Sequence, residues 1–490
     1  MNAKANSIAS IPARSRSLLG VAAVLAAGSL YGQEKPAATV GATAKPTVSA
    51  GLVNDWLRQQ SDAMSAWDVG GQIRMRYEVF DNGPVFSKAA GNNDPSRDFQ
   101  ALGVNNDNAY FLVREKLHVG YAPTPWLRAF VEGRDSSSSG DDNPANPGTD
   151  MVDLHQAYVG LGDPKTFPVT LKVGRQELLY GDERLIGPSD WGNTGRVFDA
   201  AKVRYENSDI WVDGFVGRVV VPVDRQFNEP DSHDFFSGIY ASSKTLVPIQ
   251  ESQVYVLSRN ISPGSAAGTS ARDIYTFGTR VKSLPGKLKG WDYTGELAWQ
   301  AGSISSGGTR LTQEAMASSV GGGYTFTKAF GTPRVGVEYN YSSGDGDGGA
   351  DGKSETFDNL FPTNHKHYGY MDFVGWRNVH NPRLMFSLKP AKSLLLTADY
   401  HLFWLANAGD SFYPQAGGGR SGNGYGKNAG YSPFVGSELD LDVTYNVTSW
   451  AAFRGGYGHF FKGEYIDQSK ATLGGAVDAD WVYLQATINF

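Results

Sequence analysis

The chain repeatedly alternates apolar and polar residues. In residues 67–80, Met75 and Tyr77 lie on the face opposite to Arg76 and Glu78. Successive side chains of a strand point to opposite faces, so the pattern predicts strands with one apolar and one polar face. The alternating segments are about twice as long as the strands of soluble proteins, which average about five to six residues. Strands of roughly ten residues cross a bilayer at a tilt, so the pattern predicts a membrane β-barrel with lipid outside and a polar lumen.

The predicted strands follow one another in a regular order. We expect about eighteen of them, near 67–80, 109–121, 126–135, 152–161, 168–178, 198–206, 209–219, 235–243, 250–260, 273–283, 290–301, 315–326, 332–343, 382–389, 393–404, 435–446, 450–462 and 480–490. Short connections such as 162–167 alternate with long ones such as 344–381. Tight periplasmic turns and long outer loops are typical of outer-membrane barrels. The sequence thus predicts an all-β, closed antiparallel barrel with both termini in the periplasm.

The N-terminus has the three parts of an export signal. These are a positive part with Lys4, Arg14 and Arg16, an apolar part at 18–27, and small residues at 28–32. We therefore divide the chain into a signal peptide (1–32), a periplasmic tail with room for one short helix (33–66) and a transmembrane barrel (67–490). The last strand ends on Phe490, and we expect it to pair with the first strand, because an open edge leaves backbone groups unpaired.

The composition agrees with this interpretation and excludes several other classes. The 490 residues include 60 glycines, and only 19% are charged, against about 25% in soluble domains. There is no cysteine, which excludes disulfides and thiolate metal sites. The formal net charge of −6 makes nucleic acid an improbable partner. Beyond the leader, no apolar run of about 18 residues could form a transmembrane helix.

If the apolar face of each strand meets lipid, the opposite face lines the lumen. The predicted substrate path consists of Arg74, Arg76, Arg114, Arg128, Arg134, Arg204, Arg280, Arg334, Arg383, Arg454, Glu438 and Asp440. Arginine suits the binding of carboxylates because its planar fork can bond both oxygens. The alternative is that these residues pair across strands and fill the barrel, for instance Arg454 with Asp440 or Asp442. Arg175 departs from the pattern, since parity turns it toward lipid, and we expect it at the rim or beside a bulge.

Other chemistry is weakly supported by the sequence. Asp345, Asp347 and Asp351 lie on one glycine-rich segment where Ca²⁺ would find oxygen ligands. Thr356 stands where an EF-hand loop has its glutamate, so a solvated acidic outer loop is the favoured explanation. His401 follows Asp399 on a predicted strand, yet no Gly-x-Ser-x-Gly motif accompanies it, and we expect no enzyme. No cofactor is expected.

Several short segments resemble the alginate export family of outer-membrane barrels. They are 173–187 (VGRQELLYGDERLIG), 343–372, 400–405 (YHLFWL), 436–445 (GSELDLDVTY), 453–461 (FRGGYGHFF) and the terminal WVYLQATINF. The resemblance implies an eighteen-stranded monomer that passes alginate, a polyuronate, through an arginine-lined constriction. It also implies contacts with outer-membrane lipid, an anionic saccharide and periplasmic export components. Two alternatives stay open: a general or small-anion porin, and an adhesin or receptor barrel whose pore is plugged by loops.

Overall fold

The computed structural model describes residues 52–83, 99, 107–141, 148–266, 268–415, 417–420, 425, 427–471 and 475–490. The expected signal peptide lies outside these residues, as does most of the expected tail. A helix, α1 (Leu52–Gln60), and a 3₁₀ turn, η1 (Asp62–Ala66), precede the first strand. Within the described residues, no helix is long and apolar enough to span a membrane.

In the described part of the chain, eighteen long strands form a closed antiparallel barrel. They are β1 (Trp67–Asp81), β2 (Asn108–Thr124), β3 (Leu127–Ser139), β4 (Asp150–Leu161), β5 (Val169–Gln176), β6 (Phe198–Glu206), β7 (Ile210–Val221), β8 (Glu229–Val247), β9 (Gln250–Ile261), β10 (Arg272–Ser283), β11 (Trp291–Ser306), β12 (Thr309–Thr325), β13 (Arg334–Ser342), β15 (Val379–Ala391), β16 (Leu394–Leu405), β17 (Phe434–Asn446), β18 (Ala451–Lys462) and β19 (Ala479–Asn489). The remaining elements are β14 (Lys353–Ser354), η3 (Asn364–Lys366) and α2 (Glu464–Lys470). The predicted fold class is confirmed.

The barrel closes between the two ends of the chain. β19 pairs with β1 from Gln72–Asn489 to Asp81–Asp480, and β1 pairs with β2 on its other side. Because both edges of the sheet are paired, no backbone groups of an open edge face lipid. The expected pairing of the last strand with the first is therefore confirmed.

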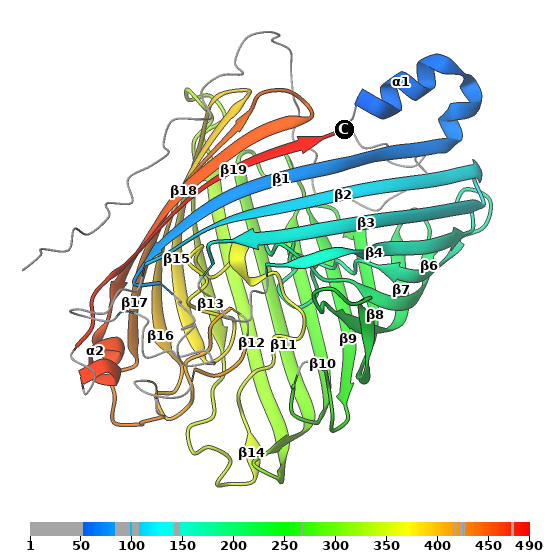
Figure 1. Ribbon diagram of the computed structural model, residues 1–490. Coiled ribbons are helices and arrows are strands. Elements are labelled where there is room, and N and C mark those ends of the chain that lie inside the picture. Colours follow the sequence, from blue (N-terminus) through cyan, green and yellow to red (C-terminus); the bar gives the residue numbers. More distant parts are fainter. Residues whose placement is uncertain are drawn as a thin grey trace, which may run out of the picture.

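The two ends of the barrel differ. The short turns lie at the end that also holds α1 and the C-terminus, whereas the long loops and β14 lie at the other end (Figure 1). We call these the turn end and the loop end. The two-residue β14, which the alternation did not predict, pairs in parallel with β12.

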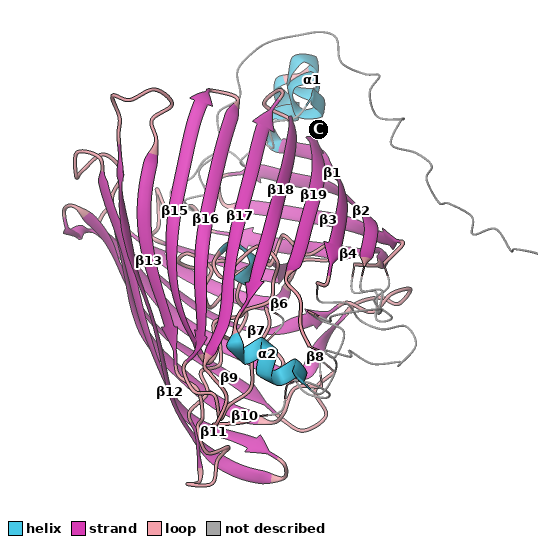
Figure 2. Cartoon of the chain, turned by 90° about the vertical axis from the view of Figure 1, so that its left-hand side faces the viewer, coloured by secondary structure: helices cyan, strands magenta, loops and turns pink. Residues whose placement is uncertain are grey.

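The outer and inner faces of the wall are as different as the alternation predicts. Apolar side chains such as Leu117, Val337 and Leu484 are exposed on the outer face. Loop segments lie inside the barrel (Figure 2). Two long loops contact the inner face of the wall, and we name them the first inner loop (177–197) and the second inner loop (355–378). They meet at a bridge between Ile186 and Phe361. Their apolar residues form the buried core of the protein together with aromatic residues of the wall.

Arg175 lies next to the last residue of β5, at the loop end of the barrel. Its guanidinium donates to both carboxylate oxygens of Asp199 on β6, at 2.8 and 3.0 Å. Asp199 shares the outward parity of the exposed Val203, so both side chains belong to the outer face at the rim. Of the two explanations considered, the rim position applies.

Candidate functional site

The lumen wall of β1 and β2 holds the tip of the first inner loop. Arg74 donates to the backbone oxygens of Asp190 (2.6 Å), Trp191 (3.1 Å) and Gly192 (3.0 Å). Arg114, directly opposite Arg74 across the two strands, donates to an Asp190 carboxylate oxygen at 2.8 Å. Both arginines are nearly inaccessible to solvent. They are thus engaged in docking this loop.

The charge of Asp190 is set by this arrangement. Burial alone would raise the pKa of its carboxyl group, but the nearby Arg114, Lys116 and Arg74 lower the pKa well below its usual range. The carboxylate therefore stays ionised near neutral pH, and it neutralises part of the arginine charge on this wall.

A stack of side chains joins the two inner loops to the wall. The Arg76 guanidinium lies 3.7 Å from the Trp191 ring centroid, and it donates to Glu78 at 2.6 Å. Trp191 also stacks on His365 of the second inner loop, with ring centroids 3.9 Å apart and planes at 8°. Tyr370 stacks on His365 in turn, at 5.1 Å. A displacement of one loop would therefore disturb the other.

Charged groups bring the first inner loop to the opposite wall as well. Asp182 pairs with Arg280 and Lys282 of β10, each at 2.7 Å. Burial tends to raise the pKa of Asp182, but these two cations lower it far below its ordinary value. The loop's Arg184 donates to Glu338 of β13 at 2.7 Å. The first inner loop thus spans the lumen, with ionic contacts on both sides.

Glu438 and Asp440 of β17 hold the second inner loop. Glu438 accepts a hydrogen bond from the backbone N–H of Met371 at 2.8 Å, and Asp440 accepts one from Tyr370 at 3.2 Å. The chain passes so close that a Cβ on Gly369 would lie 2.5 Å from the Glu438 carboxylate, and Gly369 has a φ of 90°. Glycine tolerates both the contact and the conformation. The two predicted path residues are therefore buried anchors of a loop.

The other predicted arginines are distributed over the wall. Arg134 pairs with Asp150, Arg204 with Asp213, Arg280 with Asp182, Arg334 with Asp292, Arg383 with Asp399 and Arg454 with Asp442. Asp442 is one of the two partners considered for Arg454 from the sequence. Arg128 is exposed, and the Arg454 side chain keeps 31% of its surface accessible. Four of the predicted arginines, Arg74, Arg76, Arg114 and Arg134, donate to backbone oxygens of residues 190–194 in the first inner loop.

The sequence interpretation missed the loop residues that contact these arginines. Asp182, Arg184, Asp190 and Trp191 all lie in the connection predicted after the fifth strand. Their density of charged and aromatic side chains was an available signal, but only the folded chain shows that they point inward.

The acidic segment at the start of the predicted connection 344–381 bonds its carboxylates to its own backbone. Asp345 accepts backbone N–H groups of Asp347 and Gly348, and Asp347 accepts those of Gly349 and Ala350. Among the described residues, no group of three metal-ligating side chains could hold a metal ion. His401, considered as a catalytic base, approaches Asn381 (3.4 Å) and Asp440 (3.9 Å).

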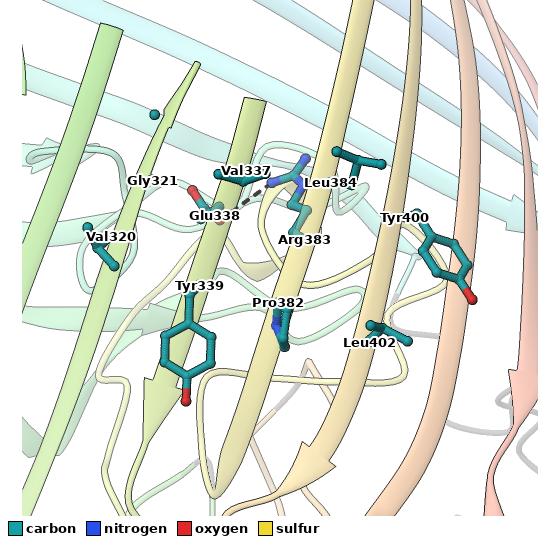
Figure 3. A pocket seen from close by; sticks show the side chains of 11 residues that line it. Val320, Gly321, Val337, Glu338, Tyr339, Pro382, Arg383, Leu384, Tyr400 and Leu402 are labelled. Atoms are coloured by element: carbon teal, nitrogen blue, oxygen red, sulfur yellow. Dashed lines mark ion pairs between the residues drawn. The ribbon is translucent and has the colours of Figure 1, made fainter. Parts of the chain in front are cut away.

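A groove of about 530 Å³ lies on the outer face of the barrel (Figure 3). It forms where Gly322 and Pro382 present little or no side chain between larger apolar neighbours. Its apolar lining consists of Val320, Val337, Tyr339, Leu384, Tyr400 and Leu402. The ion pair of Arg383 with Glu338 (3.7 Å) belongs to the inner side of the same strands. Because it opens on the lipid-facing surface, this groove is not part of the lumen.

Comparison with known families decides the class of the protein. The family model described as alginate export matches residues 66–477, which is most of the chain. The chain belongs to the alginate export family. Together with the barrel, this membership supports an outer-membrane channel. No curated protein matches the sequence of this alginate export family member.

Solved structures resemble this member of the alginate export family in fold. OpdQ of Pseudomonas aeruginosa has a TM-score of 0.55 at 13% identity, with 88% of this chain and 99% of that chain covered. OccD3 (OpdP) of the same organism has a TM-score of 0.53 at 11% identity, with coverage of 86% and 91%. OpdK of P. aeruginosa, solved with vanillate, has a TM-score of 0.51 at 12% identity, with coverage of 86% and 98%.

Proposed function

We propose that this outer-membrane channel passes an anionic, alginate-like saccharide through its charged lumen. The observation that carries the proposal is the family match over nearly the whole barrel. The lumen supports it, because Arg128 and Arg454 combine positive charge with solvent exposure on the inner wall. Cations in a low-dielectric channel attract passing carboxylates more strongly than they would in water.

The proposed orientation places the turn end in the periplasm. The short turns share this end with α1 and the C-terminus, and outer-membrane barrels direct short turns toward the periplasm. The proposed signal peptide and tail would then precede the barrel on the same side. The closed sheet has no free edge, so we propose a monomer in lipid, with export components as periplasmic partners and no catalytic step.

A second candidate is a porin for small anions. The two inner loops fill part of the lumen, and large side chains such as Phe361, Tyr368 and Trp376 are buried among them. An extended polymer would need a wider path than a monosaccharide acid. The structure of OpdK, a barrel of similar fold, was solved with vanillate, which is a small carboxylate. This agrees with a small anion as cargo.

Ion selectivity tests the proposal. We expect the purified full chain in planar bilayers to show a reversal potential that favours anions under a KCl gradient. Arg128→Glu with Arg454→Glu should reduce or reverse this preference. Arg225→Glu is the matched control, because the Arg225 side chain is 79% exposed on a loop. A clear cation preference of the wild-type channel would refute the proposal.

Cargo size separates the two candidates. Liposomes that contain the protein should swell in glucuronate, and they should swell in oligomeric uronates only if the loops admit a polymer. Swelling in the monomer alone would support the small-anion porin. Negligible conductance with intact loops, restored by deletion of residues 355–378, would instead favour a plugged receptor barrel.

A further inference from the structure

A row of cations crosses the inner wall near the turn end of β3 to β6. The strand register places Arg128 opposite Gly160, Gly160 opposite Lys172, and Lys172 opposite Lys202. Neighbouring strands are about 4.8 Å apart, so three positive side chains share a short stretch of wall. We call Arg128, Lys172 and Lys202 the cationic row. Arg128 is also one of the path residues predicted from the sequence.

The two lysines of the row carry more positive charge than the ion pairs of the described residues neutralise. Lys202 Nζ is 3.5 Å from Asp213, but the same carboxylate accepts from Arg204 at 2.5 and 2.9 Å. Among the residues that the structure describes, no carboxylate forms an ion pair with Lys172 Nζ, which lies 3.6 Å from the Tyr158 ring centroid. Like charges directly opposite each other on adjacent strands destabilise a sheet. A Lys172–Lys202 pair therefore costs stability unless an anion lies between its ammonium groups.

The wall around the row provides space for such an anion. Gly160 has no side chain between Arg128 and Lys172, and a Cβ built there would meet its nearest atom only at 3.7 Å. Beside it, Tyr158 stacks on Phe130 with centroids 5.2 Å apart, and Lys172 Nζ lies over the other side of this aromatic wall. Arg128 is exposed, and Lys172 and Lys202 are half-buried, so an anion in the lumen can reach them.

We propose that the cationic row is a binding subsite for a carboxylate of the transported molecule, next to the turn-end opening. The ligand class is a sugar acid or an aromatic acid whose carboxylate lies between the ammonium groups of the two lysines. This inference rests on the proposed anion transport, and it locates a specific contact for the anion. The docking arginines of β1 and β2 then hold the loop and leave cargo binding to the row.

The test measures block of single-channel current by glucuronate, by benzoate and by glucose, added at the turn end of the full-length protein. The double variant Lys172→Gln/Lys202→Gln is compared with Lys165→Gln/Lys287→Gln. Both variants remove two positive charges at the same end of the barrel, but Lys165 and Lys287 lie exposed in turns. We expect the row variant to weaken block by the carboxylates about threefold to tenfold. The Lys165→Gln/Lys287→Gln control should be blocked by the carboxylates as strongly as the wild-type channel. Glucose should block neither variant.

A stability measurement separates binding from a structural role. Removal of a like-charge pair should leave the thermal unfolding temperature in detergent unchanged or raise it. If the row variant blocks like the wild-type channel, the inference is wrong even though anion transport stands. A wild-type channel without anion preference would refute the proposed function first. Preferential block by glucuronate or by benzoate identifies the sugar acid or the aromatic acid as ligand.

Discussion

The inner wall holds two pairs of like charges in which the partners lie opposite each other on neighbouring strands: Arg74 with Arg114, and Lys172 with Lys202. The surroundings of the two pairs differ. Arg74 and Arg114 are covered by the first inner loop, whose backbone oxygens and Asp190 carboxylate accept from both. Among the described residues, Lys202 forms an ion pair with Asp213, and Lys172 forms none with a carboxylate. The comparison separates two states of positive charge on this wall. The buried arginines fix a loop through their hydrogen bonds, whereas the half-buried lysines form the subsite that we propose for an anion.

The largest expected effect is on the covered pair. Arg74→Ala removes three hydrogen bonds to backbone oxygens of the loop. Each oxygen keeps a second donor, Arg114 at Asp190 and Gly192 and Arg76 at Trp191. We therefore expect loop docking to lose roughly 3 kcal/mol, less than three uncompensated hydrogen bonds to a charged group would cost at about 1.5–3 kcal/mol each. Amide hydrogen exchange of residues 188–193 should accelerate, and single-channel conductance should rise. Arg225→Ala, at an exposed loop position, should change neither quantity. Unchanged exchange in Arg74→Ala would show that the loop does not depend on this wall.

A smaller effect is expected when pH changes the docking of the second inner loop through His367. Burial is the main cause that lowers the pKa of His367, and Arg184 and Lys366 lower it further. A histidine with a lowered pKa in the docked state favours docking while it is neutral. As pH falls below the ordinary histidine pKa of about 6.5, docking should weaken by up to about 1.4 kcal/mol per pH unit.

Conductance recorded from pH 8 to pH 5 checks this sign. We expect it to be flat above neutrality and to rise in acid as the second loop loosens. His367→Gln, which retains a donor for the backbone oxygen of Asp182, should remove most of the rise. Conductance that rises instead with increasing pH would contradict the assignment.

The smallest effect is expected for an arginine–aspartate pair that is exposed to solvent. Arg310 lies 2.8 Å from Asp273, and their side chains are 68% and 43% exposed. Exposed pairs contribute about 0.2–1 kcal/mol, so Arg310→Gln should shift thermal unfolding in detergent only slightly. This variant measures how much of the Arg74 effect comes from burial. A loss as large as that of Arg74→Ala would remove the distinction between covered and exposed cations.

Much of the barrel could be predicted from the sequence because alternation is a local property. Residues 67–80 and β1 (Trp67–Asp81) agree almost residue for residue. Ends near the loops were predicted less well: β8 runs over Glu229–Val247, longer than the predicted 235–243. Beyond the lipid the strand need not be apolar on one side, so the pattern fades although backbone pairing continues.

The site was less predictable. The polar face of each strand identified lumen residues such as Arg74 and Glu438, but their partners Asp190 and Met371 lie more than sixty residues away in the chain. No local pattern states whether a long connection folds inward or outward.

The order of polar and apolar residues by itself determined that this chain forms a closed barrel, because one face of every strand must meet lipid and every backbone group must be paired. Only the tertiary structure decided which lumen charges are available. Neutralisation depends on which carboxylate or carbonyl comes within hydrogen-bond distance. Inward folding of distant loops brings these groups to Arg74 and Arg114, whereas among the described residues no carboxylate forms an ion pair with Lys172, which lies over the ring of Tyr158.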